Sequence, residues 1–391
     1  MKLFRGRTFS NILAIYLVYT VIPTFSVYFL GGIAGAAIVL CLLFAGLHAR
    51  PKVICNNKEN KAFVFGWSVV FLLSILIHSA IPGTKLLIFF VFCCFFLFLK
   101  KEIQQEVLTK YAWFLSVLVL LSAIEYILYI TTGRAVILSS VTRTTDYRET
   151  YFNHLLFNVI RTDVLFSRFQ GLFTEPGNLG TTCGFMLFAT WKMKSVKFPF
   201  FVFLLCGMLS MSLAYYVYLL VFLITNVKLS GKNLAILTII TFLFIYSFHD
   251  IFEAKIYDRI NDAENVEELD NRTSEAMERA FWKSCSSGQI IFGVGINNIP
   301  ESLSSDGGSA GAKKWIYQYG IISLIIVFWI YNLVYYRRCG KNLKYRDWVF
   351  LLVYWATFYK SDIFLIPDLF VVYLIMPELN KINKTSVWTT K

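Results

Sequence analysis

The 391-residue sequence predicts an all-α, polytopic integral membrane protein with about twelve transmembrane helices. Two observations lead to this fold class. First, 57% of the residues are hydrophobic and only 16% are charged, against roughly a quarter in soluble domains. Second, several near-continuous apolar runs approach the roughly 20 residues that a helix needs to cross a bilayer. These runs are apolar on every face, whereas strands of a membrane β-barrel alternate apolar and polar residues.

The apolar runs divide the chain into twelve expected spans. They cover residues 9–28, 30–47, 62–80, 86–99, 111–130, 174–191, 198–211, 213–226, 234–250, 315–336, 347–360 and 363–379. The run 198–226 is also long enough for one tilted helix. A tight hairpin near Met211–Ser212 keeps the lysines that follow on the same side of the membrane, so we predict two short helices there.

Lysine and arginine set the expected orientation. With the N-terminus in the cytoplasm, the loops and tails on that side carry 23 of the 37 basic residues. The C-terminus then also lies in the cytoplasm, and two long loops face the opposite side. The net charge of +13 is explained by this bias, which favours anionic lipid headgroups and needs no nucleic-acid partner. We therefore expect a multi-pass protein of the bacterial inner membrane.

The same map divides the chain into five parts. A five-helix membrane segment (1–130) precedes the first large loop (131–173), and a four-helix central segment follows (174–250). A second large loop (251–314) leads to a three-helix C-terminal segment with a cytoplasmic tail (315–391). Most of the polar residues outside the cytoplasmic loops lie in the two large loops, which are therefore where we expect any chemistry.

The first large loop contains two features. Residues 151–166, which include His154 and Arg161, have interleaved apolar positions that predict an amphipathic helix on the bilayer surface. After them, Thr174 or Glu175 is placed to cap a helix whose first turn contains proline. The N-terminus of that helix would aim backbone amides at the interface, where anions bind readily. Glu175 is therefore either a simple cap or a functional carboxylate.

The second large loop contains a predicted helix over Asn271–Lys283. Arg272 and Arg279 are seven residues apart and fall on one face of that helix, together with Lys283. Guanidinium groups bind phosphate oxygens in a bidentate manner, so this stripe suits a phosphate or pyrophosphate group. The alternative interpretation is a solvated helix of mixed charge.

Three further polar features have mainly structural interpretations. Gly293-Val294-Gly295 lacks the context of a dinucleotide motif and predicts a tight turn. Glu125 lies in the fifth span, where a carboxylate usually faces a cavity, although it is close to the end of the span. Lys360, Asp362 and Asp368 cluster at the last short turn and predict an ion-paired hairpin.

Metal and nucleotide chemistry is not indicated. The four histidines are scattered, and no cysteine pair has zinc-binding spacing on a solvent face. The chain also contains neither a phosphate-binding P-loop nor a nucleophile elbow. We expect no metal and no cofactor.

The run Arg168-Phe169-Gln170-Gly171-Leu172-Phe173-Thr174-Glu175-Pro176-Gly177 resembles the R-x-x-G-x-x-x-E-P signature of Wzy-type O-antigen and capsule polymerases, in the O-antigen polymerase/ligase superfamily. The glycines at 293–295, after an arginine-containing helix, are also similar to that family. So is Gln318-Tyr319-Gly320-Ile321-Ile322 at the start of the next span. The layout of twelve spans with two large periplasmic loops extends the resemblance over nearly the whole chain.

The resemblance implies a metal-independent, GT-C-like membrane glycosyltransferase. Such enzymes polymerise undecaprenyl-pyrophosphate-linked oligosaccharide repeat units at the periplasmic face, and a chain-length regulator protein is an expected partner. By position, Arg161, Arg168, Arg272 and Arg279 would bind pyrophosphate. Arg168 would also act in catalysis, with Glu175 or His154 as the base.

Two other functions remain open. The O-antigen ligases of the same superfamily often carry a histidine before the tenth span, but residues 304–315 contain none, which favours a polymerase. A flippase or transporter of lipid-linked oligosaccharides is the alternative from another class. It predicts internal repeats and ionisable residues at mid-membrane, whereas the charges here concentrate in the loops.

Overall fold

The computed structural model describes residues 2–22, 58–79, 83–134, 136–145, 148–162, 168–226, 275–295, 311–340, 343–361, 363 and 366–381. These residues are 79% helical and form eleven α-helices. The helices are α1 (Lys2–Val21), α3 (Lys58–His78), α4 (Thr84–Leu97), α5 (Lys101–Thr132), α6 (Pro176–Trp191), α7 (Lys197–Leu209), α8 (Leu213–Asn226), α13 (Glu275–Ser286), α15 (Gly311–Cys339), α16 (Tyr345–Lys360) and α17 (Pro367–Lys381). Short 3-10 turns occur at η2 (Lys194–Val196) and η4 (Gln289–Ile291).

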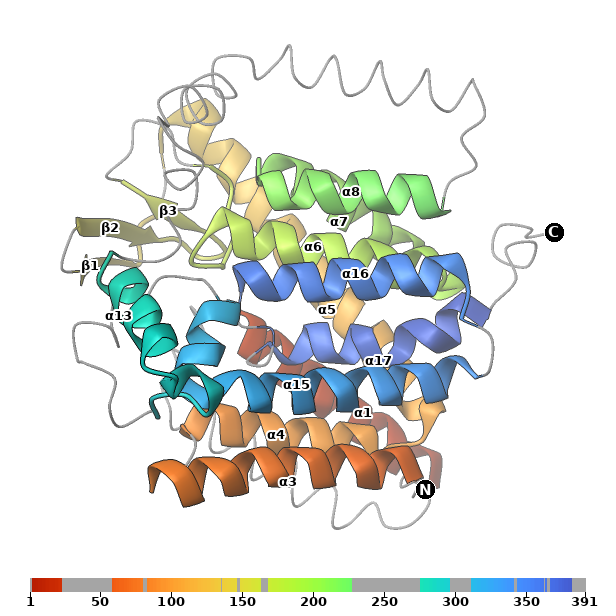
Figure 1. Cartoon of the computed structure of the whole chain (residues 1–391). Helices are drawn as coiled ribbons and strands as arrows, with labels where there is room; N and C mark the ends of the chain where they lie inside the picture. Colours follow the sequence, from red (N-terminus) through yellow and green to blue (C-terminus); the bar gives the residue numbers. More distant parts are fainter. Residues whose placement is uncertain are drawn as a thin grey trace.

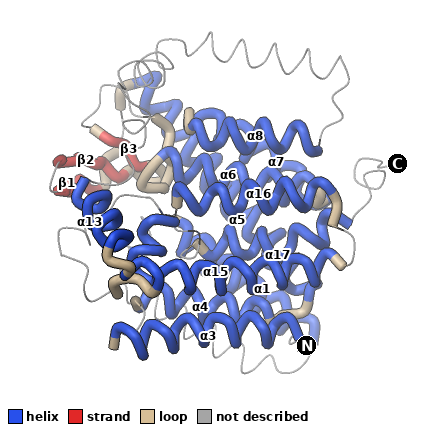
Figure 2. Tube along the Cα trace, viewed as in Figure 1, coloured by secondary structure: helices blue, strands red, loops and turns tan. Residues whose placement is uncertain are grey.

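Most of the helices lie side by side in a bundle (Figures 1 and 2). A small antiparallel sheet of β1 (Ser139–Thr145), β2 (Arg148–His154) and β3 (Val159–Arg161), in the order β1-β2-β3, lies at one end together with α13. We call this the sheet end. At the opposite end, α5 begins at Lys101 and α17 finishes at Lys381, and we call it the basic end.

Most of the described helices lie within a few residues of a predicted span, but α1 begins seven residues and α5 ten residues before the predicted start. Ten of the twelve spans coincide with described helices, while 30–47 and 234–250 lie outside the described residues. Three helices, α3, α5 and α15, are long and apolar enough to cross a membrane, and α7 and α8 are among the shorter apolar ones. Large side chains such as Phe65 (71% exposed) and Leu76 (70% exposed) lie on the outer surface of the bundle, as expected for contact with lipid.

The predicted hairpin within 198–226 is confirmed. α7 ends at Leu209 and α8 begins at Leu213, so three residues make the turn. Met211 at its centre has a φ of +48°, a conformation that the tight reversal requires. The predicted helix in the second large loop is also confirmed over Glu275–Ser286.

The predicted surface helix over 151–166 is wrong. His154 pairs with Ser139 of β1 and with Val159 of β3, so the described part of this run forms strands and a turn. Burial alternates along β2, because Phe152 and His154 are buried while Tyr151 is exposed. That period of two competes with the helical spacing of the leucines that follow. The described residues remain mostly helical, consistent with the predicted all-α membrane protein, with this one small sheet added.

Helix α17 forms the centre of the bundle. All of its residues are buried except Glu378 and Lys381, as expected for a helix with neighbours on every side. In its first turn, Asp368 is buried and accepts a hydrogen bond from the Tyr111 hydroxyl of α5 (3.1 Å). Asp368 thus lies in the protein interior and makes its described contact there rather than in an ion-paired hairpin.

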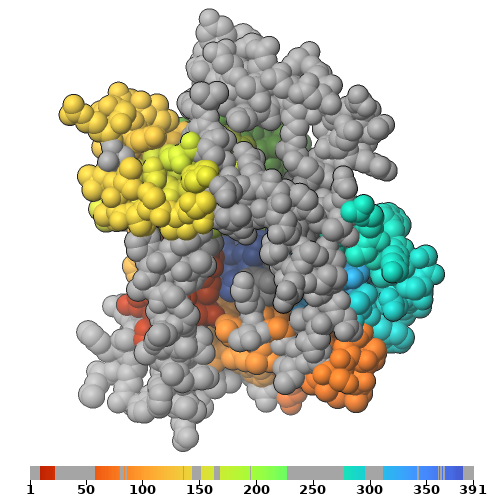
Figure 3. All heavy atoms as spheres, turned by 90° about the vertical axis from the view of Figure 1, so that its left-hand side faces the viewer, coloured from red at the N-terminus to blue at the C-terminus, as the bar shows by residue number. Residues whose placement is uncertain are grey.

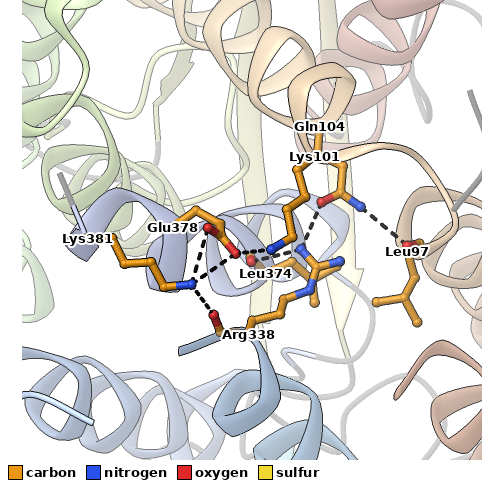
Figure 4. Close-up of polar contacts among 7 residues, drawn as sticks. All are labelled: Leu97, Lys101, Gln104, Arg338, Leu374, Glu378 and Lys381. Atoms are coloured by element: carbon orange, nitrogen blue, oxygen red, sulfur yellow. Dashed lines mark hydrogen bonds and ion pairs between the residues drawn. The ribbon is translucent and has the colours of Figure 1, made fainter. Parts of the chain in front are cut away.

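A polar network closes the basic end of the bundle (Figure 4). The buried Arg338 of α15 donates a hydrogen bond from Nη1 to Oε1 of Gln104 in α5 (2.8 Å). Glu378 forms ion pairs with Lys101 of α5 and with Lys381, whose Nζ also donates to the Arg338 carbonyl (2.6 Å). Lys101, Arg338 and Lys381 are among the basic residues that set the expected orientation. They therefore also join α5, α15 and α17.

A kink at Gly320 divides α15. This glycine has a φ of +82°, and the kink leaves the carbonyls of Tyr317 and Gln318 to accept hydrogen bonds from Val294 (2.7 Å) and Gly295 (3.2 Å). A Cβ atom on Gly320 would lie 2.3 Å from the Phe292 carbonyl carbon. Residues 293–295, where the sequence predicts a tight turn, are irregular backbone with a positive φ at both glycines, and their close partner is the backbone of α15.

Replacing Gly320 by alanine tests this contact. Gly320→Ala combines an unfavourable positive φ with a backbone clash and should destabilise the protein by more than about 2 kcal/mol. Gly133→Ala is the matched control, because Gly133 has a φ of +65° but nothing within 4 Å of its Cβ position. Thermal unfolding in one detergent measures both variants, and equal losses would contradict the proposed packing.

Candidate functional site

The sheet is attached to the bundle through the end of α5. Oε1 of Glu125 accepts a hydrogen bond from the backbone N–H of Leu156 (3.2 Å), and Oε2 accepts one from that of Phe157 (2.8 Å). One turn earlier, the Ser122 hydroxyl donates to the Phe157 carbonyl. The carboxylate expected to face a cavity instead binds the turn between β2 and β3.

The segment 168–175 is attached to the sheet in turn. The backbone N–H of Val159 in β3 donates to the Gly171 carbonyl (2.8 Å), and Gly171 adopts a φ of +57° beside Ser122. Phe169 is fully buried and packs against Tyr126 of α5, with ring centroids 5.2 Å apart. The glycine of the R-x-x-G-x-x-x-E-P motif therefore lies where the strand and α5 converge.

Arg168 connects this segment to the α7–α8 turn. Its Nη1 donates a hydrogen bond to the Met211 carbonyl (3.3 Å), and its side chain is half-buried. The start of α6 packs against the same turn, because a Cβ on Gly180 would lie 2.6 Å from the Ser212 Cβ. The guanidinium is thus held beside the N-terminal turns of α6.

Glu175 is the residue that caps α6. It has an extended backbone, Pro176 follows at the first helical position, and the Glu175 carbonyl accepts from the N–H of Asn178 (3.1 Å). Its side chain makes no capping hydrogen bond and is exposed. The predicted start of the helix is confirmed, while the predicted side-chain cap is absent. The carboxylate therefore projects from the helix N-terminus toward solvent or a substrate.

The two candidate residues in the sheet differ in accessibility. His154 has no exposed surface, and burial lowers the pKa of its imidazole, so the ring is neutral at neutral pH. Arg161 at the end of β3 is half-buried and pairs with Phe152 of β2. A fully buried ring does not reach a substrate hydroxyl directly, so Glu175 is better placed as a base.

Helix α13 carries Arg279 on a separate part of the sheet end. Its apolar side, with Met277 and Phe281, packs against Tyr317 of α15. Arg279 and Lys283 are exposed on the other side, as the spacing predicted. In Figure 3, which looks onto the sheet end, α13 and the strands lie at opposite sides of the face. The fourth predicted arginine, Arg272, lies outside the described residues.

The structure therefore brings together some of the predicted residues. Arg168 and Glu175 lie on one short segment, and the Val159–Gly171 hydrogen bond joins it to the sheet that carries Arg161. The residues that position this segment were not identified from sequence. Ser122 and the Met211 carbonyl have no local sequence signal, because their partners are 35 and 43 residues away.

Among the residues that the structure describes, no group of three or more histidine, cysteine, aspartate or glutamate side chains is arranged to hold a metal ion. No protein-family model matches the chain, and no curated protein matches its sequence.

The role of Glu125 can be tested by Glu125→Gln. The amide side chain has only one acceptor oxygen, so one charge-assisted bond to the turn is lost, with an expected destabilisation of about 1–3 kcal/mol. Hydrogen exchange at the Leu156 and Phe157 amides should accelerate. Glu102→Gln is the control, because Glu102 is exposed at the other end of the same helix. Unchanged exchange at both amides would refute the attachment.

Burial of neutral His154 predicts a dependence of stability on pH. The unfolded chain binds a proton near pH 6.5 while the folded chain resists it, so stability is complete above that pH and falls as the pH drops below it. His154→Leu removes this titration. Thermal unfolding across the acidic range should show a steeper loss for the wild type than for the variant. Parallel pH profiles would show that His154 is not held neutral.

Proposed function

We propose that this protein is a metal-independent membrane glycosyltransferase that polymerises undecaprenyl-pyrophosphate-linked oligosaccharide repeat units into O-antigen or capsular polysaccharide. The observation that supports this most is the placement of Arg168 and Glu175. The arginine is held by the Met211 carbonyl in the α7–α8 turn, and the carboxylate of Glu175, on the same short segment, is exposed. Both residues belong to the motif that resembles the polymerase signature.

In this proposal the sheet end faces the periplasm of a bacterium and the basic end faces the cytoplasm. The bias of lysine and arginine toward one set of loops supports this orientation. The twelve spans then bring both large loops to the periplasmic side. Lipid-linked substrates would reach the sheet end by diffusing within the outer leaflet of the inner membrane.

The proposed chemistry requires little beyond positioning and charge stabilisation. During transfer, the bond between the growing glycan and the pyrophosphate of its lipid is broken. Negative charge therefore develops on the phosphate oxygens. Arg168 lies beside an α6 N-terminus whose amides also favour negative charge, and both would stabilise the leaving pyrophosphate. Arg161, Arg272 and Arg279 are proposed to bind the pyrophosphate groups of the two lipid-linked substrates.

Glu175 is the proposed general base. The attacking hydroxyl of the acceptor sugar must lose its proton as the glycosidic bond forms, and an exposed carboxylate on the same segment as Arg168 can accept it. His154 was the other candidate, but its ring is buried within the sheet. We assign His154 to supporting the sheet that positions Arg161.

A flippase or transporter is a second candidate, and one observation favours it. Asp368 is an ionisable residue in the interior of the bundle, which is common along transport pathways. An O-antigen ligase is the alternative within the same superfamily. A chain-length regulator protein is a proposed partner of the polymerase.

Arg168→Ala tests the proposal in a host that depends on this protein for surface glycan. At normal protein level it should lower polymer yield at least about 100-fold, because a charge-stabilising donor is lost. Single repeat units on the lipid anchor should remain, as seen by glycan electrophoresis. Arg134→Ala is the control, because Arg134 is exposed elsewhere in the same loop. Unchanged polymer in Arg168→Ala would refute the role, and loss of all surface glycan would indicate a ligase or flippase.

A further inference from the structure

An apolar groove lies between α3 and α4, toward the basic end of the bundle. It has a volume of about 840 Å³, within the roughly 300–1,000 Å³ of ligand pockets. Its lining comes from one stripe of each helix, with Lys61 at one end: Lys61, Val64, Phe65 and Ser68 on α3, Phe90, Val91, Cys94 and Phe95 on α4, and Phe98 at the C-cap of α4.

The groove exists because α3 packs more closely against α15 than against α4. Gly66 faces Ile330 of α15, where an added Cβ would lie only 2.4 Å from the Ile330 Cγ2. Toward the sheet end, Phe71 and Phe90 are in edge-to-face contact at 4.9 Å and close the groove. From that contact the lining residues continue to Lys61, so the groove extends toward the basic end.

The lining of the groove on α3 spans about two thirds of the hydrocarbon of one leaflet of a bilayer. From Lys61 to Ser68 the axis of α3 rises about 10 Å, at about 1.5 Å per residue. One leaflet contributes about half of the roughly 30 Å of hydrocarbon. A hydrocarbon chain whose headgroup lay at Lys61 would therefore extend along the groove toward the middle of the membrane.

The mouth of the groove is positively charged. Lys58 and Lys61 are exposed on consecutive turns of α3, and Lys100 is exposed just after α4. In the part of the chain that the structure describes, none of these lysines forms an ion pair. An ammonium above an apolar groove matches a molecule with an anionic head and a hydrocarbon tail.

We propose that this groove binds one acyl chain of an anionic phospholipid, whose phosphate contacts Lys61. A phospholipid fits better than a lipid-linked glycan, because the groove opens at the basic end and the candidate site lies at the sheet end. The inference does not depend on the proposed function. It assigns a lipid site to a face of the bundle that contains none of the predicted site residues.

The test measures lipid retained by the purified full-length protein in detergent, by native mass spectrometry after addition of phosphatidylglycerol or phosphatidylcholine. The wild type should retain phosphatidylglycerol preferentially. Ser68→Trp, which fills the groove, should abolish retention. Lys61→Gln should weaken it about fivefold, because one lysine near an anionic headgroup is worth about that much.

Two variants serve as matched controls. Leu76→Trp places the same bulk on the outer surface of α3 outside the groove, and Lys344→Gln removes an exposed lysine elsewhere at the basic end. Both should retain lipid as the wild type does, and thermal unfolding checks that each variant is folded. Equal retention in Ser68→Trp and Leu76→Trp, equal retention of the two lipids, or no retention by the wild type would overturn the proposal. No retention by the wild type is also the result expected if another part of the chain fills the groove.

Discussion

The carboxylate of Glu125 accepts hydrogen bonds from two consecutive backbone amides, and the arrangement of the sheet end depends on this interaction. It fixes the β2–β3 turn on α5. The Val159–Gly171 hydrogen bond then attaches the segment 168–175, and Arg168 connects that segment to Met211 in the α7–α8 turn. Buried backbone groups need partners, so irregular chain next to an apolar bundle is stable only where such groups are satisfied. The same carboxylate therefore positions the candidate site.

The basic end follows the same rule with different groups. Arg338 and Glu378 are buried or half-buried among apolar helices, and each has polar partners on a neighbouring helix. Removing one partner from such a network leaves a desolvated charge, which is more costly than the intact pair is stabilising. These contacts hold α5, α15 and α17 in a fixed relation at the end opposite the sheet. The central helix α17 is thereby held at the basic end, away from the candidate site.

The candidate site and the proposed lipid groove lie toward opposite ends of the bundle, as expected if the two have different ligands. The proposed chemistry calls for fixed positive charge and an accessible carboxylate, and the segment before α6 carries Arg168 and the exposed Glu175. Rigid helices hold the segment that carries both residues, so little reorganisation is needed when charge develops. The proposed lipid groove lies at the other end, where exposed lysines suit anionic headgroups.

The sequence by itself determined the apolar helices, the reversal at Met211, the helix over Glu275–Ser286 and the start of α6 at Pro176. These features are encoded locally, by runs of apolar residues, by periodicity and by proline at a helix start. Only the tertiary structure decided that His154 belongs to a buried strand, that Glu125 binds the β2–β3 turn and that Asp368 faces Tyr111. The partners of Glu125 and Asp368 are distant in sequence, 31 and 32 residues for Glu125 and 257 for Asp368, and the strand pairs of His154 join three separate segments. A local pattern states which groups need partners, but only the packed bundle determines which partners they meet.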